Sequence, residues 1–128
     1  MKFKNMFSPI QIGPMTVKNR FVVPPMGNNF ANSDGTWSDE SVAYYGERAK
    51  GQFGLITIEA TVVHKGAKGG PKKPCLYDDN SIESLKKITD ACHEEGAKVS
   101  IQLQNAGPEG NAKNAGAPIQ AATAIASA

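Results

Sequence analysis

Three short apolar segments, separated by two stretches with helical periodicity, constrain the fold of this chain more than any other feature. The segments are RFVVPPM (20–26), FGLITIEA (53–60) and VSIQLQ (99–104). The second is a nearly continuous apolar run, which is typical of a strand buried on both faces of a parallel sheet. Strands that alternate with helices in this way indicate right-handed parallel βαβ units. The pattern alone does not separate an open sheet from a (β/α)₈ barrel.

The stretches between these strands carry the signals of amphipathic helices. In the first, Ser38 or Thr36 can cap the helix start, and Gly51 suits the position just past its end. The second is DDNSIESLKKITDACHEEG. We expect Asn80 to cap it, with Glu83 three residues later as in a capping box.

A β-hairpin is expected before the first parallel strand, over residues 9–18. Alternating isoleucines there precede the turn signal Gly13-Pro14. The 128 residues then read as one domain, with the hairpin followed by a βαβαβ unit over 20–104 and a tail over 105–128. Its last part, NAGAPIQAATAIASA (114–128), shows no caps and no clear period.

Composition excludes several classes of function. The net charge of +2 is too small to indicate a nucleic-acid or anionic-membrane partner. No apolar run approaches the ~20 residues that span a bilayer, and the first residues lack the apolar stretch of a signal peptide. The two cysteines, Cys75 and Cys92, form neither a disulfide framework nor a metal-binding pattern. We therefore expect no metal site and a cytoplasmic location.

The carboxyl ends of the strands are the places to look for function. Both candidate architectures put their sites there. In this chain those ends are Pro24–Gly27, Glu59–Thr61 and Gln102–Asn105. Gly27 permits a close backbone approach or a positive φ, while a simple strand terminator explains the two prolines equally well.

Gln102 is the most informative polar residue at these ends. If Val99, Ile101 and Leu103 face the helices, the alternation turns Gln102 toward the interior of a barrel. A neutral amide carries both donors and an acceptor. It therefore suits the edge of an amide-like heterocycle better than a metal or a phosphate.

Other residues have competing explanations. Glu59 is either a functional acid or a structural hydrogen-bonding group. The basic loop HKGAKGGPKKP (64–74) matches neither standard phosphate-binding motif, so we expect a solvated, mobile loop, although its lysines can attract an anionic ligand. Cys75 lies in a loop and is a weak redox candidate.

Three stretches together resemble the N-terminal part of the old yellow enzyme family of flavin-dependent ene-reductases. They are FSPIQIGPMTVKNRFVVPPMGNNF, YYGERAKGQFGLITIEATVV and GAKVSIQLQNAG, in the family's order and spacing. The nearest branch is similar to the 2-enoate reductase and 2,4-dienoyl-CoA reductase type. The resemblance implies a TIM barrel that binds FMN at the carboxyl ends of its strands, with the hairpin closing the opposite end.

The resemblance also implies site residues. Those expected to contact FMN follow or end the strands, and they are Pro24, Pro25, Met26, Gly27, Ala60 and Gln102. The Pro24–Gly27 segment would lie against the flavin largely through its backbone, and Gln102 would hydrogen-bond the pyrimidine edge. Asn29 and Asn105 are the candidates on the substrate side, and no catalytic residue is assigned.

The sequence departs from the family at several points. Gly27 stands where the family often has a Thr or Cys that tunes the flavin. Asn105 and Pro108 stand where a histidine and an arginine are usual. A TIM barrel needs roughly 250 residues. We therefore expect an N-terminal fragment, inactive alone, whose open sheet edges need the missing remainder of the barrel or self-association.

For the parent protein, the resemblance implies an FMN-dependent oxidoreductase. NADH or NADPH would reduce the flavin, which would pass hydride to the activated alkene of an unsaturated carbonyl or enoyl substrate. An iron–sulfur cluster and FAD would belong only to parts of the parent that lie outside this sequence. Two alternatives stay open, namely a TIM-barrel enzyme for a phosphorylated ligand without flavin, and a non-catalytic assembly fragment.

Overall fold

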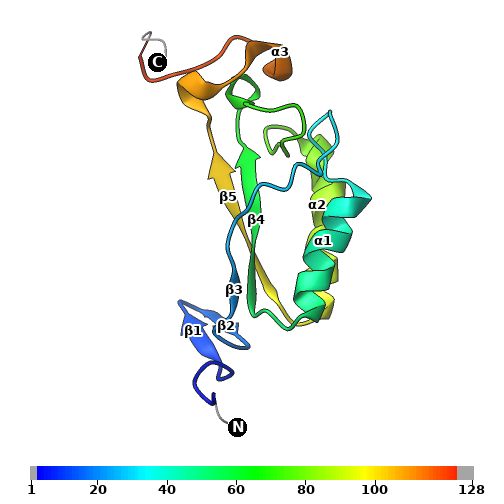
Figure 1. The fold of residues 1–128 in the computed structure, drawn as a ribbon, viewed down its shortest axis with the longest axis vertical. Helices are drawn as coiled ribbons and strands as arrows, with labels where there is room; N and C mark the ends of the chain where they lie inside the picture. Colours follow the sequence, from blue (N-terminus) through cyan, green and yellow to red (C-terminus); the bar gives the residue numbers. More distant parts are fainter. Residues whose placement is uncertain (1–2, 124–128) are drawn as a thin grey trace.

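The protein begins with a small antiparallel hairpin at one end of an elongated molecule (Figure 1). The computed structural model describes residues 3–123. In the hairpin, β1 (Ile10–Ile12) pairs with β2 (Met15–Val17) across a turn at Gly13. The φ of Gly13 is 55°, a left-handed value that glycine adopts without strain. The expected hairpin is therefore confirmed.

A three-stranded parallel sheet follows, in the order β3 (Val22–Val23), β4 (Leu55–Val62) and β5 (Lys98–Gln104). The helix α1 (Asp39–Lys50) connects β3 to β4, and α2 (Ile82–Glu94) connects β4 to β5. The predicted β-α-β-α-β order is confirmed. The three strands make an open sheet, because the described residues do not close a barrel.

Both helices cover the same face of this sheet (Figure 1). Between the two layers lies the main core, to which β4 contributes Ile56 and Ile58 and α2 contributes Ile88 and Cys92, all fully buried. Burying a side chain of the size of isoleucine stabilises a fold by about 1.5–3 kcal/mol. The apolar periodicity of the strands and helices therefore fixes the layer arrangement.

The other face of the sheet is polar near its centre. Thr57 on β4 and Ser100 on β5 share a hydrogen bond of 2.8 Å between their hydroxyl oxygens, and Gln102, two residues further along β5, is exposed. The expectation that Leu103 faces the helices is wrong, because Leu103 is 63% exposed. Only the earlier part of β5, with Val99 and Ile101, packs against the helix layer in the described residues.

A β-bulge interrupts the pairing of β4 with β5. Ile58 pairs with Ile101, but the next paired residues are Thr61 and Leu103, so β4 advances one residue more than β5. Bulges of this kind bend a strand and re-aim its side chains, and they are common beside active sites.

The helix ends differ in part from those expected. Ser38 does cap α1, accepting a hydrogen bond of 3.2 Å from the Ser41 N–H. The left-handed residue after α1 is Gln52, with φ 68°, rather than Gly51. Asn80 does not cap α2, because a 3₁₀ turn precedes that helix and the Asp78 carboxylate accepts from the Asn80 N–H instead.

Four short helical turns complete the described structure. They are the 3₁₀ turns η1 (Lys65–Ala67), η2 (Asp79–Ser81) and η3 (Gly107–Glu109) and the helix α3 (Ala112–Ala115). The prediction that residues 114–128 lack caps is wrong, because Gly116 ends α3 with a left-handed φ of 60° and its N–H donates to the Ala112 carbonyl. Residues 124–128 of the predicted tail lie outside the described residues.

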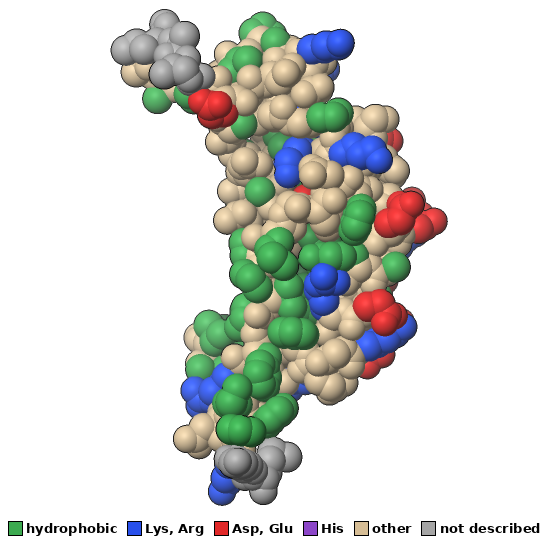
Figure 2. Space-filling model, in the orientation of Figure 1, with side chains coloured by type: hydrophobic (Ala, Val, Ile, Leu, Met, Phe, Trp, Pro, Cys, Tyr) green, Lys and Arg blue, Asp and Glu red, His purple; other side chains and the backbone are tan. Residues whose placement is uncertain are grey.

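Apolar and charged side chains gather on different parts of the surface. Figure 2 shows apolar side chains along the hairpin and the neighbouring part of the sheet, while charged side chains lie mainly over the helices. Exposed apolar residues include Phe7, Ile12 and Val22. Between residues 3 and 123, we find no helix with the length and apolarity required to cross a membrane.

Candidate functional site

The loops that follow the three parallel strands meet at one end of the sheet, opposite the hairpin (Figure 1). The Asn28 N–H, after β3, donates to the Glu59 carboxylate at the end of β4, with a distance of 3.3 Å. The Val63 N–H, after β4, donates to the Gln104 carbonyl on β5 at 3.2 Å. The strand ends singled out in the sequence therefore share one edge of the fold.

Most of the predicted site residues at this edge are accessible. Met26 is 51% exposed, and Pro24, Gly27, Asn29, Gln102 and Asn105 are also exposed, whereas Pro25 and Ala60 are half-buried. Ala60 lies in the bulge and has no partner in the register with β5. This leaves part of the β4 backbone free of the regular ladder at the point where it reaches the site.

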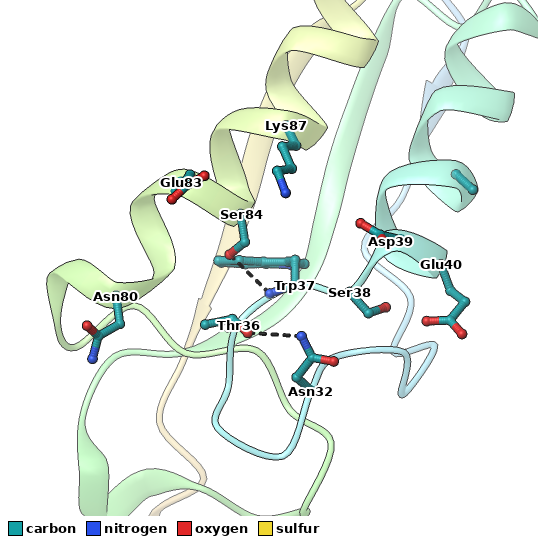
Figure 3. Close-up of a pocket in the computed structure, with 11 residues that line it drawn as sticks. Asn32, Thr36, Trp37, Ser38, Asp39, Glu40, Asn80, Glu83, Ser84 and Lys87 are labelled. Carbon is teal, nitrogen blue, oxygen red and sulfur yellow. Dashed lines mark hydrogen bonds between the residues drawn. The ribbon is translucent and has the colours of Figure 1, made fainter.

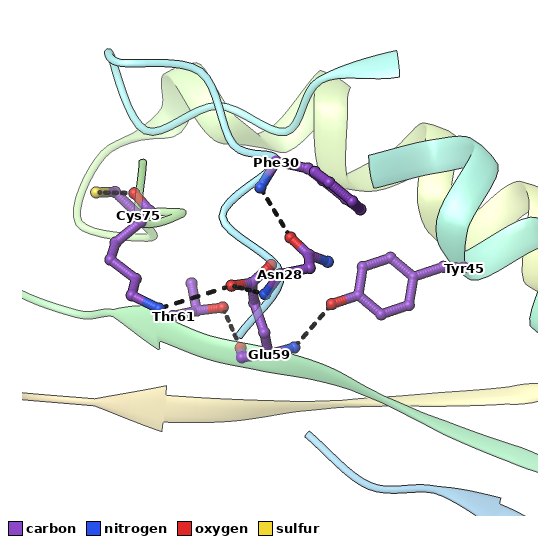
Figure 4. A network of polar contacts seen from close by, with 7 residues as sticks. Asn28, Phe30, Tyr45, Glu59, Thr61 and Cys75 are labelled. Atoms are coloured by element: carbon purple, nitrogen blue, oxygen red, sulfur yellow. Dashed lines mark hydrogen bonds and ion pairs between the residues drawn. The ribbon is translucent and has the colours of Figure 1, made fainter. Parts of the chain in front are cut away.

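Glu59 anchors the loop after β3 (Figure 4). Its side chain is fully buried, its Oε2 accepts from the Asn28 N–H, and the Lys73 Nζ lies 4.0 Å from the same oxygen. Burial raises the pKa of Glu59 above its ordinary value, and the Asn28 N–H and the Lys73 ammonium oppose that rise. Of the two explanations left open for Glu59, these contacts favour the structural one.

Two buried polar atoms in this cluster have no hydrogen-bond partner among the described residues. They are Oε1 of Glu59 and Nδ2 of Asn28. Buried polar groups are satisfied in the great majority of native structures, so unpaired ones mark places where a water or a ligand atom is needed. The cluster beneath the strand ends is thus incomplete in its polar contacts.

The loop after β3 also holds an unusual backbone conformation. Asn28 accepts a hydrogen bond of 2.9 Å from the Phe30 N–H through its side-chain oxygen, and Asn29 has φ 59°. Asparagine tolerates left-handed values better than most residues, yet such values outside glycine are uncommon and cluster at functional sites. Gly27 does not adopt a positive φ, so a close approach is what its missing side chain permits.

The basic loop after β4 is more ordered than expected. Lys68 is only 4% exposed and donates to the Ser33 carbonyl at 2.9 Å, while the Ala67 carbonyl accepts from the Ala106 N–H. The expectation of a solvated loop is therefore wrong for its middle part. Cys75, which follows this loop, is buried, and burial raises the pKa of its thiol, which disfavours the reactive thiolate.

The tail packs against this basic loop, while Asn105 bonds within its own turn. The Asn105 side-chain oxygen accepts from the Gly107 N–H at 2.9 Å, and the Asn114 side chain donates to the Gly69 carbonyl at 3.1 Å. Asn105 therefore shapes the turn after β5. The capping residue Asn111 was the signal for this local structure that the sequence reading missed.

A separate cavity lies between the starts of α1 and α2, and it was not anticipated (Figure 3). It has a volume of about 720 Å³ and is lined by carboxylates, Lys87 and the indole of Trp37. Trp37 is buried, and its backbone N–H donates to the Ser84 hydroxyl at 3.2 Å. No group of His, Cys, Asp or Glu within residues 3–123 is arranged to hold a metal ion, so this cavity carries no evident metal chemistry.

The residues at the strand ends fit the FMN group that the sequence resemblance implies. An isoalloxazine ring needs an apolar surface, a partner for its polar edge and backbone groups that approach closely. Met26 exposes apolar atoms, Gln102 presents an exposed amide, and Ala60 and Gly27 bring backbone to the same edge. A Cβ atom added at Gly27 would meet only Lys73 Nζ, at 2.8 Å, and Glu59 Oε2, at 3.8 Å, so the missing side chain leaves room that a flexible lysine reaches.

Comparison with known proteins identifies the family to which the chain belongs. The family model described as NADH:flavin oxidoreductase / NADH oxidase family matches residues 5–126. The old yellow enzyme from Pichia sp. AKU4542 is 34% identical with a TM-score of 0.87, over 94% of this chain and 32% of that chain. The old yellow enzyme from Trypanosoma cruzi is 32% identical with a TM-score of 0.86, over 98% of this chain and 36% of that chain.

A third similar structure is a 2-naphthoyl-CoA reductase in complex with 2-naphthoyl-CoA. It is 33% identical with a TM-score of 0.84, over 89% of this chain and 17% of that chain. The chain therefore spans about a third of the length of the two old yellow enzymes and a smaller share of the naphthoyl-CoA reductase.

Proposed function

Because the chain belongs to the NADH:flavin oxidoreductase / NADH oxidase family, we propose that its strand ends form part of the flavin site of an FMN-dependent ene-reductase. The solved relatives are TIM barrels, and the β3–β4–β5 sheet corresponds to part of such a barrel. In that fold, active sites lie at the carboxyl ends of the strands. This is the edge where Gly27, Ala60 and Gln102 are found.

Each of these residues has a distinct task in the proposal. The Gln102 amide hydrogen-bonds the pyrimidine edge of the isoalloxazine, for which it offers both donors and an acceptor. The Pro24–Gly27 segment lies against the ring through its backbone and the Met26 side chain. Ala60 contributes backbone from the bulge in β4, where the regular ladder is interrupted. Glu59 acts behind them, holding the loop through the Asn28 N–H.

Bound FMN supplies the chemistry, taking hydride from NADH or NADPH and delivering it to the β-carbon of an activated alkene. The residues of this chain bind and orient the cofactor. A substrate of the unsaturated carbonyl or enoyl class is supported by the relative solved with 2-naphthoyl-CoA. The exposed Lys65 on the loop after β4 would attract an anionic carrier group. FAD and an iron–sulfur cluster are not part of the proposal.

The observation that carries this proposal is the exposed side chain of Gln102, at the same edge as the exposed Gly27 and a bulged strand. The proposal is tested by measuring the affinity of the full-length protein for FMN, with quenching of flavin fluorescence as the readout. We expect Gln102→Ala to weaken binding roughly 10-fold, the equivalent of one or two hydrogen bonds.

Gln11→Ala is the matched control. Gln11 is an exposed glutamine in the hairpin, at the opposite end of the sheet, where its side chain bonds to Thr16. This variant should bind FMN like the unsubstituted protein. Equal affinities for the Gln102 and Gln11 variants would remove the assigned role of Gln102, and an absence of FMN binding by the unsubstituted protein would refute the proposed function.

A further inference from the structure

Gly27 leaves a space that another residue fills. A Cβ atom built on Gly27 would lie 2.8 Å from the Nζ atom of Lys73 and 3.8 Å from Oε2 of Glu59. The φ of Gly27 lies outside the left-handed region, so the backbone itself does not require glycine here. The space, rather than the backbone conformation, is what a side chain at position 27 would disturb. The ammonium of Lys73 occupies it.

Lys73 reaches this space from the loop after β4. Its side chain passes over Gly70, where a Cβ atom would lie 3.6 Å from Lys73 Cγ. Its Nζ lies 4.0 Å from the buried Glu59 carboxylate, and the side chain is 24% exposed. Figure 4 shows Glu59 at the centre of this network of polar contacts. A second glycine and a buried carboxylate therefore both help to place the ammonium.

The Lys73 ammonium keeps its capacity to bind a further group. Among residues 3–123, the contact of the ammonium with a charged group is the 4.0 Å ion pair with Glu59, and Nζ donates no hydrogen bond. An ammonium has three donors, so these remain available. Glu59 offers Oε2 to both Lys73 and the Asn28 N–H. The cation is thus held at the edge of the strand-end site while part of its surface faces outward.

We propose that Lys73 supplies a fixed positive charge to the cofactor site, its ammonium standing in the side-chain space of Gly27 and held there by Glu59. This rests on the proposed function, because the flavin is the group that would feel the charge. Reduction adds negative charge to a flavin, and a nearby cation stabilises added negative charge. Lys73 is accordingly a positioning and tuning residue that raises the reduction potential of the bound flavin.

The first experiment needs no cofactor. In the cofactor-free protein, the titration of Glu59 is followed by NMR of its labelled carboxyl carbon. Removing the ammonium with Lys73→Met should raise the pKa of Glu59 further, because an opposing positive charge is lost. Gly27→Ala should do the same, since the new methyl group displaces Nζ. Lys72→Met, which removes a neighbouring exposed lysine, should leave the titration unchanged.

The second experiment measures the midpoint potential of bound FMN by titration with redox dyes. We expect Lys73→Met to lower the potential, Lys73→Arg to preserve it, and Lys72→Met to match the unsubstituted protein. A merely structural role for Lys73 would change stability or FMN affinity and leave the potential where it was.

The outcomes separate this inference from the function on which it rests. If FMN binds and the Lys73→Met potential equals that of the unsubstituted protein, the inference is wrong and the proposed function stands. If the unsubstituted protein binds no FMN, the proposed function fails and the tuning role fails with it. If Gly27→Ala leaves the Glu59 titration unchanged, the assigned position of the ammonium is wrong.

Discussion

The two ends of the parallel sheet differ in how completely their polar groups are hydrogen-bonded. At the amino end, beside the hairpin, the Asn19 side chain donates to the Gln52 carbonyl at 2.7 Å and accepts from the Phe21 N–H at 3.0 Å. Lys18 donates to the Glu95 carbonyl at 2.6 Å. At the carboxyl end, Glu59 and Asn28 each keep a buried atom without a partner among residues 3–123.

Aromatic packing and backbone conformation follow the same division. Phe21 packs between Phe7 and Phe53 at the amino end, with ring centroids 5.2 and 6.4 Å apart. The loop at the carboxyl end instead holds Asn29 in a left-handed conformation. In barrels of this type, one end of the strands serves stability and the other serves binding. The comparison predicts that substitutions at the amino end mainly change stability, whereas substitutions at the carboxyl end mainly change binding.

The largest effect is expected at the amino end, from Gly54→Ala. A Cβ atom there would lie 2.7 Å from both the Asn19 side chain and Val17 Cγ1, and 2.9 Å from the Asn19 carbonyl, which is backbone and cannot move away. We expect a loss of about 3 kcal/mol in the free energy of unfolding, measured by urea denaturation. The FMN affinity of the folded protein should stay unchanged.

Gly46→Ala is the control for this substitution. Its added Cβ would meet only the Ala91 methyl, at an ordinary distance of 3.7 Å, within a helix that favours alanine. It should be neutral or stabilising. A Gly54→Ala variant as stable as Gly46→Ala would break the assignment of the amino end as the tightly packed one.

The second prediction concerns pH and the carboxyl end. The pKa of Glu59 is raised in the folded state, so protonated Glu59 favours folding. Its contribution to stability is fully present below the unfolded pKa and is lost as the pH rises through the folded pKa. Glu59→Gln keeps an acceptor for the Asn28 N–H and cannot ionise. The variant should therefore lose less stability than the unsubstituted protein as the pH rises. Its free energy of unfolding, relative to that of the unsubstituted protein, should be higher at neutral pH than in acid.

Denaturant titrations of both proteins from pH 4 to pH 7 measure this difference. The effect should be smaller than that of Gly54→Ala, because Lys73 and the Asn28 N–H already offset part of the cost of ionisation. A variant that loses stability equally at both pH values would show that the pKa of Glu59 is the same in the folded and the unfolded protein.

How much of this could be foreseen depends on how local each feature is. The hairpin turn at Gly13 and the buried run of β4 follow from neighbouring residues and were predicted, and Ser38 was one of two candidates for the cap of α1. The bulge at Ala60 and the burial of Lys68 depend on pairings with distant segments. No periodicity within a single segment encodes those pairings.

The site shows the same limit. The sequence directed attention to Gly27, Glu59 and Gln102 one at a time, because each stands at the end of an apolar run. It could not show that Lys73, far along the chain, fills the space beside Gly27, since that contact exists only once two loops meet. The failed Asn80 cap has a local cause instead, because Asp78 caps the 3₁₀ turn that precedes α2 and accepts from the Asn80 N–H.

A third prediction compares two candidate helix caps, Ser38 and Asn80, near the carboxyl end of the sheet. Ser38→Ala should cost about 1 kcal/mol in unfolding free energy, because the Ser41 N–H loses its acceptor in a buried place. Asn80→Ala should cost less than about 0.5 kcal/mol, since the exposed Asn80 side chain caps nothing. Paired thermal or urea unfolding measures both. Equal costs would restore Asn80 as a cap and overturn the assignment of Asp78.

The smallest effect on stability is expected from Asn29→Gly, and it sharpens the comparison most directly. Glycine adopts φ 59° freely, so the loop keeps its shape, and the gain from relieved strain offsets the greater freedom of the unfolded chain to within about 0.5 kcal/mol. FMN affinity should be unchanged. If turnover of an enoyl substrate falls while affinity for FMN holds, the Asn29 side chain contacts substrate, as the sequence suggested.

If turnover is also unchanged, only the backbone conformation of residue 29 matters. Asn29→Ala then becomes the decisive variant, because it removes the same polar group and cannot adopt φ 59° without a cost of about 1–2 kcal/mol. A loss of FMN affinity in the alanine variant alone, read from flavin fluorescence, would assign Asn29 to shaping the loop. At the carboxyl end, polar groups would then be left unpaired because the backbone is held in the shape that the cofactor requires. At the amino end, the side chains instead stabilise the sheet.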